Sequence, residues 1–453
     1  MQYSEQDIQN WDNAHNIHPF KEADTNCYVI AEGKGAYVRD INGKKILDGI
    51  AGLWCVNIGH GRKELADAMA EQATKLAYYS SFVAFTNVPS TLLAKKVCSL
   101  APDNLNHLYF SLGGSEANDV ATRIVHHYNL LRGRPEKKHI IARKNAYHGM
   151  TYLTASISGI ADNNKNYHTV SDIIHHVSAP SCYRKPEVGM TDDQYVDYLA
   201  MEFESKIMEI GENKVAMFFA EPIMGAGGLH VAPIGYHKKM WEICQKYEVM
   251  YISDEVVSGF CRLGEFFASE PVFNIKPDII TSAKGITSGY FPLAATIISD
   301  EIYNIISQGD FTSGYTYSGH PIGAAVGLKN IEIMEKEDVG GNVKSVSIYM
   351  YQKLEELKKY PILGDVRGRN FMIGLEFVKN QESKEAFPES VKVAGKIVEE
   401  CFANGLIVRP LGGGIIVVSP PLIWKRSHVD EFIFILEEAI KNTIDQLTCD
   451  GHL

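Results

Sequence analysis

The amino-acid sequence predicts an α/β protein with a large domain, built on a mostly parallel central sheet, and a smaller α+β domain. Three observations support this fold class. From about residue 107, short apolar runs repeatedly end in glycine or polar residues, and helical patterns follow them. These runs are apolar throughout, as is typical of parallel strands buried on both faces. After about residue 325 the order changes to long amphipathic helices followed by strands interleaved with helices.

The first elements are predicted to be short strands and one helix. Residues 28–48 alternate in polarity and contain Asn42-Gly43 between two strand-like runs. This dipeptide is a strong signal for a β-hairpin. Residues 62–76 carry Leu65, Met69 and Ala73 at helical spacing, which predicts a helix there.

The strands of the large domain follow in order, and their ends carry polar residues. The apolar runs lie within residues 107–111, 138–143, 215–220, 249–254, 278–282 and 292–299. In open α/β sheets, ligands bind at the carboxyl ends of the strands, so functional residues are expected there. Asp254, Lys284 and the Gly113-Gly114 turn all fall at such ends. We therefore expect them to meet at one edge of the sheet.

The smaller domain is predicted from the last third of the chain. Helices are expected over residues 322–334 and 343–360, then strands within 371–378, 406–412 and 414–422, and a final helix. The predicted division is an N-terminal segment (1–60) packing with the small domain, a large cofactor-binding domain (61–325) and a small C-terminal domain (326–453).

Composition and charge exclude several classes of protein. The 453 residues carry a formal net charge of −11, which argues against nucleic acid or an anionic membrane as the main partner. The start of the chain lacks the basic and apolar regions of a signal peptide. No run is as long as a membrane span. The eight cysteines show no metal-ligand spacing, so we predict no metal site and a cytoplasmic location.

Lys284 is an unusual residue for its predicted position. It follows the apolar residues Ile279 and Ile280, at the end of a strand that is expected to be buried. A buried ammonium is costly unless it is paired, neutralised or used chemically. Two interpretations are open: the side chain reaches out to solvent from the strand end, or its amine forms a Schiff base, which an apolar setting favours.

Other polar residues at strand ends also allow two interpretations. Asp254 is either a paired or capping carboxylate or the partner of a protonated cofactor nitrogen, as an aspartate is for pyridoxal phosphate (PLP). Val256, two residues on, would face the same side and could pack on a flat ring. Gly113, Gly114 and Ser115 form either a capped turn or an anion-binding nest at a helix N-terminus.

Three more residues fit the same scheme. Tyr147 could stack on a planar cofactor or be an ordinary core tyrosine. Thr316 lies just before a helix and suits either phosphate binding or capping. Arg409 could bind a carboxylate with its guanidinium through two parallel hydrogen bonds, or it could form a structural ion pair. Together these residues provide an anion nest, an aspartate, a lysine and a stacking aromatic, which is the set that PLP requires.

The sequence resembles the class III aminotransferases, PLP enzymes of fold type I, from about residue 25 to residue 440. The resemblance rests on GGSEAND, NAYHG, AEPIMGAGG, ISDEVVSGFCRLG, DIITSAKG, YTYSGHPIG and LIVRPLGGG, in the order of the family. AGLWCVNIGHGRKEL is similar to the ω-transaminases that use pyruvate as acceptor. The resemblance implies PLP as the cofactor and a homodimer or higher homo-oligomer with shared active sites.

The resemblance also implies a role for each site residue. Lys284 would form the Schiff base and shuttle the substrate proton, and Asp254 would pair with the ring nitrogen. The phosphate would be held by Gly114 and Ser115, with Thr316 completing that site from the partner subunit. Tyr147 and Val256 would cover the two faces of the ring. The substrate would contact Phe20, Trp54, Phe82, Tyr147 and Arg409.

The chain departs from the family pattern at several positions. Ala226 stands where many members acting on α-amino acids carry a glutamate that pairs with the arginine at position 409. This difference favours an amine donor without an α-carboxylate. Further differences lie at Leu112, Cys261, Leu263 and Ser313.

The predicted reaction is a transamination from a primary amine to pyruvate. The donor would be a diamine, an ω-amino acid, taurine or an aralkylamine, and the products would be alanine and an aldehyde or ketone. Two alternatives stay open at this point: an aminomutase or PLP decarboxylase of the same fold, and a non-catalytic homologue.

Overall fold

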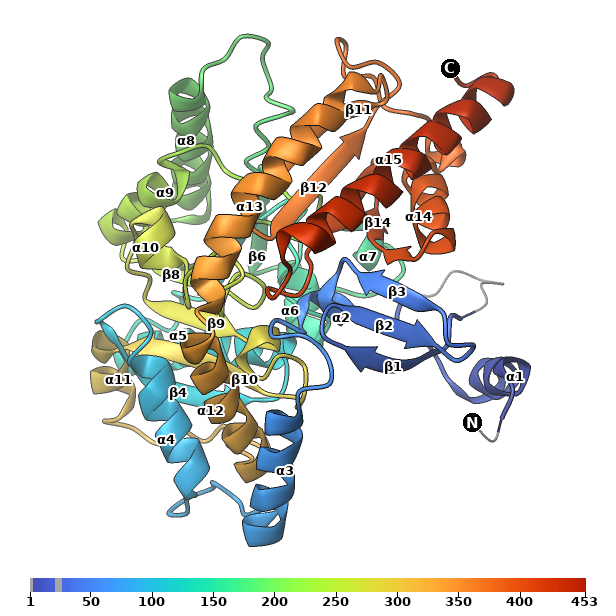
Figure 1. Cartoon of the computed structure of the whole chain (residues 1–453). Helices are drawn as coiled ribbons and strands as arrows, with labels where there is room; N and C mark the ends of the chain where they lie inside the picture. Colours follow the sequence, from blue (N-terminus) through green and yellow to red (C-terminus); the bar gives the residue numbers. More distant parts are fainter. Residues whose placement is uncertain (1–2, 21–26) are drawn as a thin grey trace.

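The computed structural model describes residues 3–20 and 27–453 and confirms the predicted α/β fold (Figure 1). Its central sheet has seven strands in the order β4-β10-β9-β8-β7-β5-β6. In that order the strands are Leu105–Ser111, Ala294–Ser299, Ile279–Ser282, Met250–Asp254, Val215–Ala220, His139–Arg143 and Ile174–Val177. Strand β10 is antiparallel to both β4 and β9, while the other pairs are parallel. The carboxyl ends of β4, β8 and β9 therefore lie at one edge of the sheet.

The inner strands of the sheet, β7 to β10, are buried on both faces, which explains why they are mostly apolar. All six residues of β7 are buried. Phe219 packs in a core with helix α5 (Gly114–Leu131), whereas Phe218 packs in a second core with α8 (Asp192–Ile210) and α9 (Tyr236–Lys246). Successive side chains of one strand thus point into opposite cores. Strand β6 was not predicted, since its sequence IHHV is half polar.

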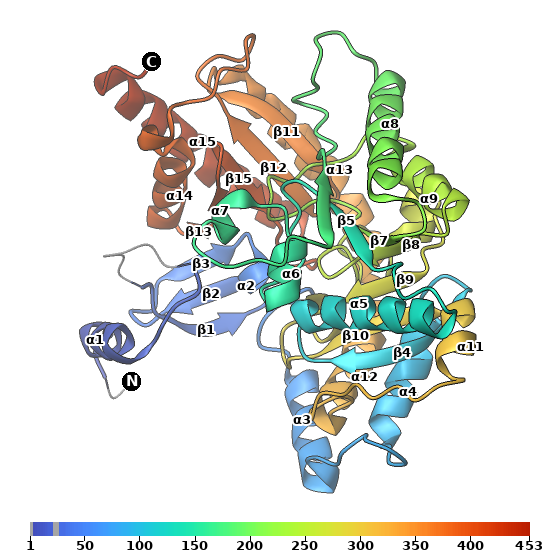
Figure 2. The ribbon, with the colours of Figure 1, turned by 180° about the vertical axis from the view of Figure 1, so that it is seen from behind.

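Further helices surround this sheet (Figure 2). Helix α12 (Pro321–Lys336) packs against α3 (Lys63–Leu76) and α4 (Val88–Cys98). The shorter helices are α6 (Tyr152–Ile157), α7 (Ala161–Asn164), α10 (Ser269–Phe273) and α11 (Asp300–Ile306). None of the helices in the described residues is long and apolar enough to cross a membrane.

The C-terminal third forms an antiparallel sheet with helices packed on it. The strand order is β11-β12-β15-β14: Leu363–Arg369, Met372–Phe377, Ile415–Val418 and Arg409–Leu411. Its helices are α13 (Val339–Glu356), α14 (Val393–Ala403) and α15 (Arg426–Cys449). The short 3₁₀ helices are η1 (Lys284–Ile286), η2 (Leu357–Lys359) and η3 (Glu389–Val391). Strand β11 was not predicted, because glycine and charged residues interrupt its apolar pattern.

The N-terminal strands join a strand from the far end of the chain. After α1 (Glu5–His15), strands β1 (Ile30–Lys34), β2 (Tyr37–Asp40) and β3 (Lys45–Asp48) form an antiparallel sheet, followed by α2 (Ala51–Trp54). The β2–β3 hairpin contains the predicted Asn42-Gly43 turn, and Gly43 has a φ of 87°. Strand β13 (Leu406–Ile407) pairs in parallel with β3. The domain boundaries themselves remain a prediction.

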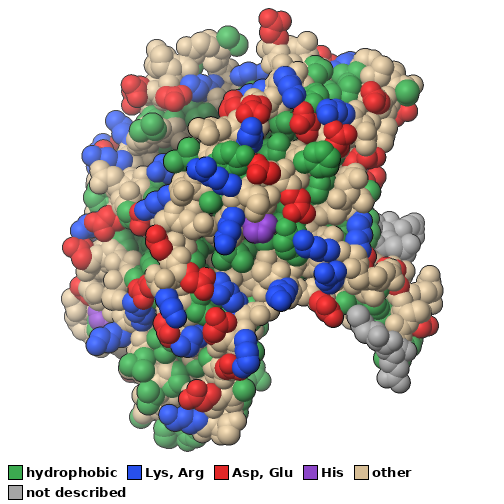
Figure 3. Space-filling model, in the orientation of Figure 1, with side chains coloured by type: hydrophobic (Ala, Val, Ile, Leu, Met, Phe, Trp, Pro, Cys, Tyr) green, Lys and Arg blue, Asp and Glu red, His purple; other side chains and the backbone are tan. Residues whose placement is uncertain are grey.

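The outer surface carries both acidic and basic side chains, as expected from a sequence with 55 acidic and 44 basic residues. Figure 3 shows positive and negative side chains interspersed over one face of the molecule. The same view shows a hollow between the N-terminal strands and the lobe that carries α3.

Candidate active site

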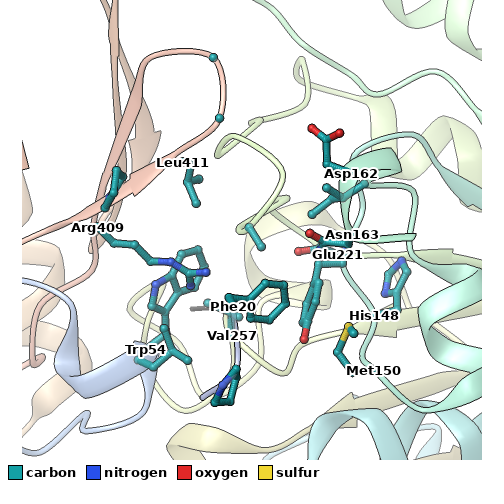
Figure 4. Close-up of a pocket in the computed structure, with 18 of the residues that line it drawn as sticks. Phe20, Trp54, His148, Met150, Asp162, Asn163, Glu221, Val257, Arg409 and Leu411 are labelled. Carbon is teal, nitrogen blue, oxygen red and sulfur yellow. Dashed lines mark hydrogen bonds between the residues drawn. The ribbon is translucent and has the colours of Figure 1, made fainter. Parts of the chain in front are cut away.

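A cavity of about 1220 Å³ opens where the carboxyl ends of β4, β8 and β9 meet the N-terminal and C-terminal segments. Residues from all three parts of the chain line it. Nine of the predicted site residues are among them: Phe20, Trp54, Gly114, Ser115, Tyr147, Asp254, Val256, Lys284 and Arg409. In Figure 4, Arg409 and Trp54 lie on one side, Glu221 and His148 on the other, and Phe20 and Val257 between them.

Lys284 lines the cavity two residues after the end of β9, as the first residue of η1. Burial lowers the pKa of its amine, because the charged form loses solvation there. In the described part of the chain its Nζ forms no hydrogen bond or ion pair that would stabilise the ammonium. Its φ of 43° is left-handed, and this strained conformation is typical of functional sites. The amine is thus disposed towards the neutral, nucleophilic form.

Asp254 ends β8 and is held by three hydrogen bonds. The side chains of His148 and Asn118 contact its Oδ2, through His148 Nδ1 and Asn118 Nδ2, each at 2.8 Å. The Val256 backbone N–H donates to Oδ1 at 3.1 Å. These partners fix the carboxylate at the wall of the cavity. His148 and Asn118 were not predicted as site residues, although both lie within motifs, NAYHG and GGSEAND, that were singled out.

The N-terminus of α5 forms the anion-binding part of the cavity. The helix begins at Gly114, and the preceding Gly113 provides no side-chain cap. Its first N–H groups and its helix dipole therefore favour an anion. Ser115 Oγ accepts a hydrogen bond from the Met150 N–H at 3.0 Å. A Cβ at Gly114 would lie 2.9 Å from Val256 Cγ1, so only glycine fits this close contact.

Tyr147 and the buried Glu221 form one wall of the cavity. Glu221 Oε1 accepts from the Tyr147 N–H at 3.1 Å, and Oε2 accepts from the Gly225 N–H at 2.9 Å. Burial raises the pKa of Glu221 and of the Tyr147 hydroxyl. Glu221 was not predicted, although it sits at the end of β7, the kind of position that the strand-end rule favours.

Arg409 reaches the cavity from β14 and has no carboxylate partner among the described residues. Burial lowers its pKa, because the guanidinium loses solvation there. Ala226 also lines the cavity, so the wall is neutral at the position where the pattern of the family has a glutamate. Two other departures, Cys261 and Leu263, are buried outside the cavity lining.

Phe82 and Thr316 lie outside the cavity of their own chain. The Thr316 carbonyl accepts a hydrogen bond from Tyr78 Oη at 2.6 Å. A Cβ at Gly314 would lie 2.7 Å from Phe82 Cζ, so the two segments pack against each other at an exposed edge. The structure therefore does not bring Phe82 to the cavity lining within one chain.

The residues of the cavity fit PLP. An uncapped helix N-terminus matches its phosphate, and an oriented carboxylate matches its ring nitrogen. Val256 and Tyr147 supply apolar surface, and the amine of Lys284 matches its aldehyde. Two buried atoms at this wall, His148 Nε2 and Asn118 Oδ1, have no hydrogen-bond partner among the residues that the structure describes.

Comparisons with known proteins agree with this chemistry. The family model described as Aminotransferase class-III matches residues 20–440. The putrescine–pyruvate aminotransferase of Pseudomonas aeruginosa is 40% identical over 95% of this chain and 94% of its own length. The diaminobutyrate–2-oxoglutarate transaminase of Halomonas elongata is 36% identical over 96% of this chain and 94% of its own.

Solved structures show the same fold. The ω-transaminase of Pseudomonas jessenii, in complex with PMP, superposes with a TM-score of 0.95 at 31% identity and covers 97% of this chain and 99% of its own. An (S)-enantioselective ω-transaminase of Thermomicrobium roseum superposes with a TM-score of 0.95 at 37% identity, over 98% of this chain and 100% of its own. The protein therefore has the fold type I of PLP-dependent transferases and belongs to the class III aminotransferases, whose cofactor is PLP.

Proposed function

We propose that the protein transfers the amino group of a primary amine without an α-carboxylate to pyruvate, giving alanine and an aldehyde or ketone. Arg409 carries this proposal: it is a cavity arginine that lacks a carboxylate partner in the described residues and lies in a wall with Ala226. Such a guanidinium suits the carboxylate of a keto acid. The putrescine–pyruvate aminotransferase named above supports an amine donor and pyruvate as acceptor.

The cofactor supplies the electron sink of the reaction, stabilising negative charge at the substrate carbon that loses its proton. Lys284 would hold the cofactor and, once released, accept and return that proton through its Nζ. The lowered pKa of this amine suits the role, because a general base works best when its pKa lies near the ambient pH. Proton transfer by a positioned base contributes about 10²–10⁴-fold.

The other residues would bind and orient the reactants. Asp254, oriented by His148 and Asn118, would keep the ring nitrogen protonated. Gly114 and Ser115 would bind the phosphate at the start of α5. Tyr147 and Val256 would hold the ring between them. Phe20 and Trp54 would enclose the carbon chain of the amine, while Arg409 would orient the keto acid in the second half of the reaction.

The active form is proposed to be a homodimer or a larger homo-oligomer. Thr316 of one subunit would then complete the phosphate site of the other, and Phe82 would line the other subunit's cavity. Their position outside the cavity of their own chain supports this arrangement.

A donor panel tests the reaction. Putrescine, taurine, β-alanine and an aralkylamine are each incubated with enzyme, PLP and either pyruvate or 2-oxoglutarate. We expect alanine from pyruvate with at least one amine, and no product with Lys284→Ala. Arg409→Ala should raise KM for pyruvate about 10–100-fold and change KM for the amine much less, since one charge-assisted contact contributes ~1.5–3 kcal/mol.

The outcomes separate the alternatives. Faster formation of glutamate from 2-oxoglutarate would contradict pyruvate as the acceptor. Absence of an amino acid product with every amine would favour an aminomutase or decarboxylase. Full activity in Lys284→Ala would refute the proposed role of that lysine.

A further inference from the structure

Three side chains with metal-binding atoms converge in the N-terminal segment, away from the sheet edge that carries Lys284. They are Asp12 in α1, His18 after it and Cys27 just before β1, and their donor atoms all lie within 4.8 Å of one another. His18 Nε2 lies 2.6 Å from Asp12 Oδ2 and 3.6 Å from Cys27 Sγ. Figures 1 and 2 both show α1 beside the N-terminal strands.

The chemistry of this cluster fits zinc. A sulfur, an imidazole nitrogen and a carboxylate oxygen are the ligand types that Zn²⁺ takes. Ligands bound tetrahedrally at ~2.0–2.3 Å lie roughly 3.3–3.8 Å apart, so small side-chain shifts would bring these atoms into place. His18 and Asp12 expose 33% and 16% of their side chains, which leaves a path for an ion to enter.

Neighbouring residues hold the cluster in this arrangement. Asn16 Nδ2 donates to Asp12 Oδ1 at 2.8 Å and so turns Oδ2 towards His18. Gln9 Nε2 donates to the Cys27 carbonyl at 3.0 Å and ties this residue to α1. Outer contacts of this kind orient the ligands of known metal sites. The linear spacing of the three residues matches no motif, which is why the sequence predicts no metal.

We propose that Asp12, His18 and Cys27 bind one zinc-type divalent cation, which joins α1 to the chain before β1 and positions the segment leading to Phe20. Phe20 lies two residues after His18 and lines the active-site cavity. A cation there would restrict Phe20 and so influence how the amine substrate fits. The metal-binding part is independent of the proposed function, whereas the effect on substrate rests on it.

Zinc binding to the holoenzyme tests the first part. After treatment with a chelator and gel filtration, zinc chloride is titrated in competition with a chromophoric chelator, and bound metal is measured by mass spectrometry. We expect one zinc per chain. Cys27→Ser and His18→Ala should each weaken binding at least about 10-fold, and Asn16→Ala should have a smaller effect. The controls His15→Ala and Cys449→Ser, which alter exposed residues, should bind as the parent does.

Alkylation gives a second, residue-specific measurement. Zinc should slow the reaction of Cys27 with iodoacetamide and leave that of the exposed Cys449 unchanged in the same sample. Absence of stoichiometric zinc, or equal binding by Cys27→Ser and the parent, would overturn the site.

The effect on the cavity has its own test. With an active amine donor, zinc should change KM for that amine in the parent but not in Cys27→Ser or Phe20→Ala. Zinc binding without any change in KM would overturn the link to Phe20 and leave the metal site intact. An enzyme inactive with every amine would refute the proposed function, while the zinc measurements would still decide the site.

Discussion

At the scale of single residues, His148 and Asn118 determine how well Asp254 can act. Asp254 is buried, and the oxygens of a buried carboxylate need hydrogen-bond partners. The side chain of His148 is fully buried, and its Nδ1 contacts Oδ2 of Asp254 at 2.8 Å. We therefore regard His148 as a positioning residue that acts through Asp254.

Replacing His148 should weaken catalysis without abolishing cofactor binding. His148→Ala removes one hydrogen bond to a buried charge, which corresponds to ~1.5–3 kcal/mol, or about 10–100-fold in kcat. The pH at which the bound cofactor's absorbance changes should shift as well, because the environment of Asp254 changes. His237→Ala is the control: His237 is buried but hydrogen-bonds Tyr251 and Pro222. If both variants shift the absorbance equally, His148 has only a structural role.

Asp278 should make stability depend on pH. Burial raises its pKa from 3.8 to about 7, although the Tyr251 N–H donates to Oδ2 at 2.8 Å. Because the folded pKa exceeds the unfolded value, folding favours the protonated form. Its contribution to stability is complete below about pH 4 and is lost as the pH rises through about 7.

Asp278→Asn removes this titration. The variant should gain free energy of unfolding relative to the parent as the pH rises from about 4 to about 7, by up to ~1.4 kcal/mol per pH unit, and the gain should level off above about pH 7. Urea unfolding at several pH values measures the difference. Asp445→Asn, which replaces an exposed carboxylate on α15, is the control for the loss of one carboxylate. A constant difference between Asp278→Asn and the parent across this range would contradict the argument.

How far the site could be predicted depends on the residue. Lys284 and Asp254 could be located because each ends an apolar strand, which is a local pattern. His148 and Asn118 could not be assigned to Asp254, because that contact depends on how α5 and the loop after β5 pack on β8. Glu221 was missed although it directly follows β7, because local patterns do not show which carboxylates near strand ends face the cavity.

At the scale of elements, the loop after β7 and the segment of α2 form one wall of the cavity. A Cβ at Gly225 would lie 2.2 Å from Trp54 Cζ3, so the glycine allows the indole to pack on this loop. The predicted strands were found because each has its own apolar run. The pairing of β3 with β13 could not be foreseen, since paired residues such as Leu47 and Leu406 are about 360 positions apart and pairing leaves no local signal.

Gly225→Ala should displace Trp54 from this wall. We expect KM for the amine to rise about 10-fold, equivalent to ~1.4 kcal/mol, with a change in the near-ultraviolet circular dichroism of tryptophan. Gly395→Ala is the matched control, because Gly395 also lines the cavity and its Cβ would have no contact closer than 3.7 Å. This control should keep its KM and become slightly more stable, as alanine favours helices. An unchanged tryptophan spectrum in Gly225→Ala would show that the wall adapts in another way.

At the scale of the whole molecule, an exposed apolar surface adjoins the segment of Thr316. It comprises Tyr78, Tyr79, Phe82, Val83, Phe85, Val88, Leu92 and Tyr317. Tyr78 and Tyr317 contact each other edge to face, so the surface is continuous across the two segments. Contiguous exposed apolar surfaces of this kind mark protein interfaces. This surface is where we propose that a second copy of the chain binds, because such a copy would cover it and bring Thr316 to a neighbouring cavity.

Mixed dimers test whether the active site is shared. Lys284→Ala and Thr316→Glu chains are each expected to be inactive, the second because its carboxylate repels the phosphate. If Thr316 acts in the partner's site, the mixed dimer has one site with both parental residues. Random pairing of co-expressed chains makes half of the dimers mixed, so about a quarter of the parental activity should return.

The control pairs Lys284→Ala with a chain that carries both changes, because this mixed dimer has no parental Lys284 and should remain inactive. Thr316 is exposed in its own chain, so its replacement should leave the fold of that chain intact. Mass spectrometry of the intact complexes verifies that mixed dimers have formed. If they form and activity stays absent, Thr316 does not act across the interface. Activity that returns only in the mixed sample would show that each cavity is completed by two chains.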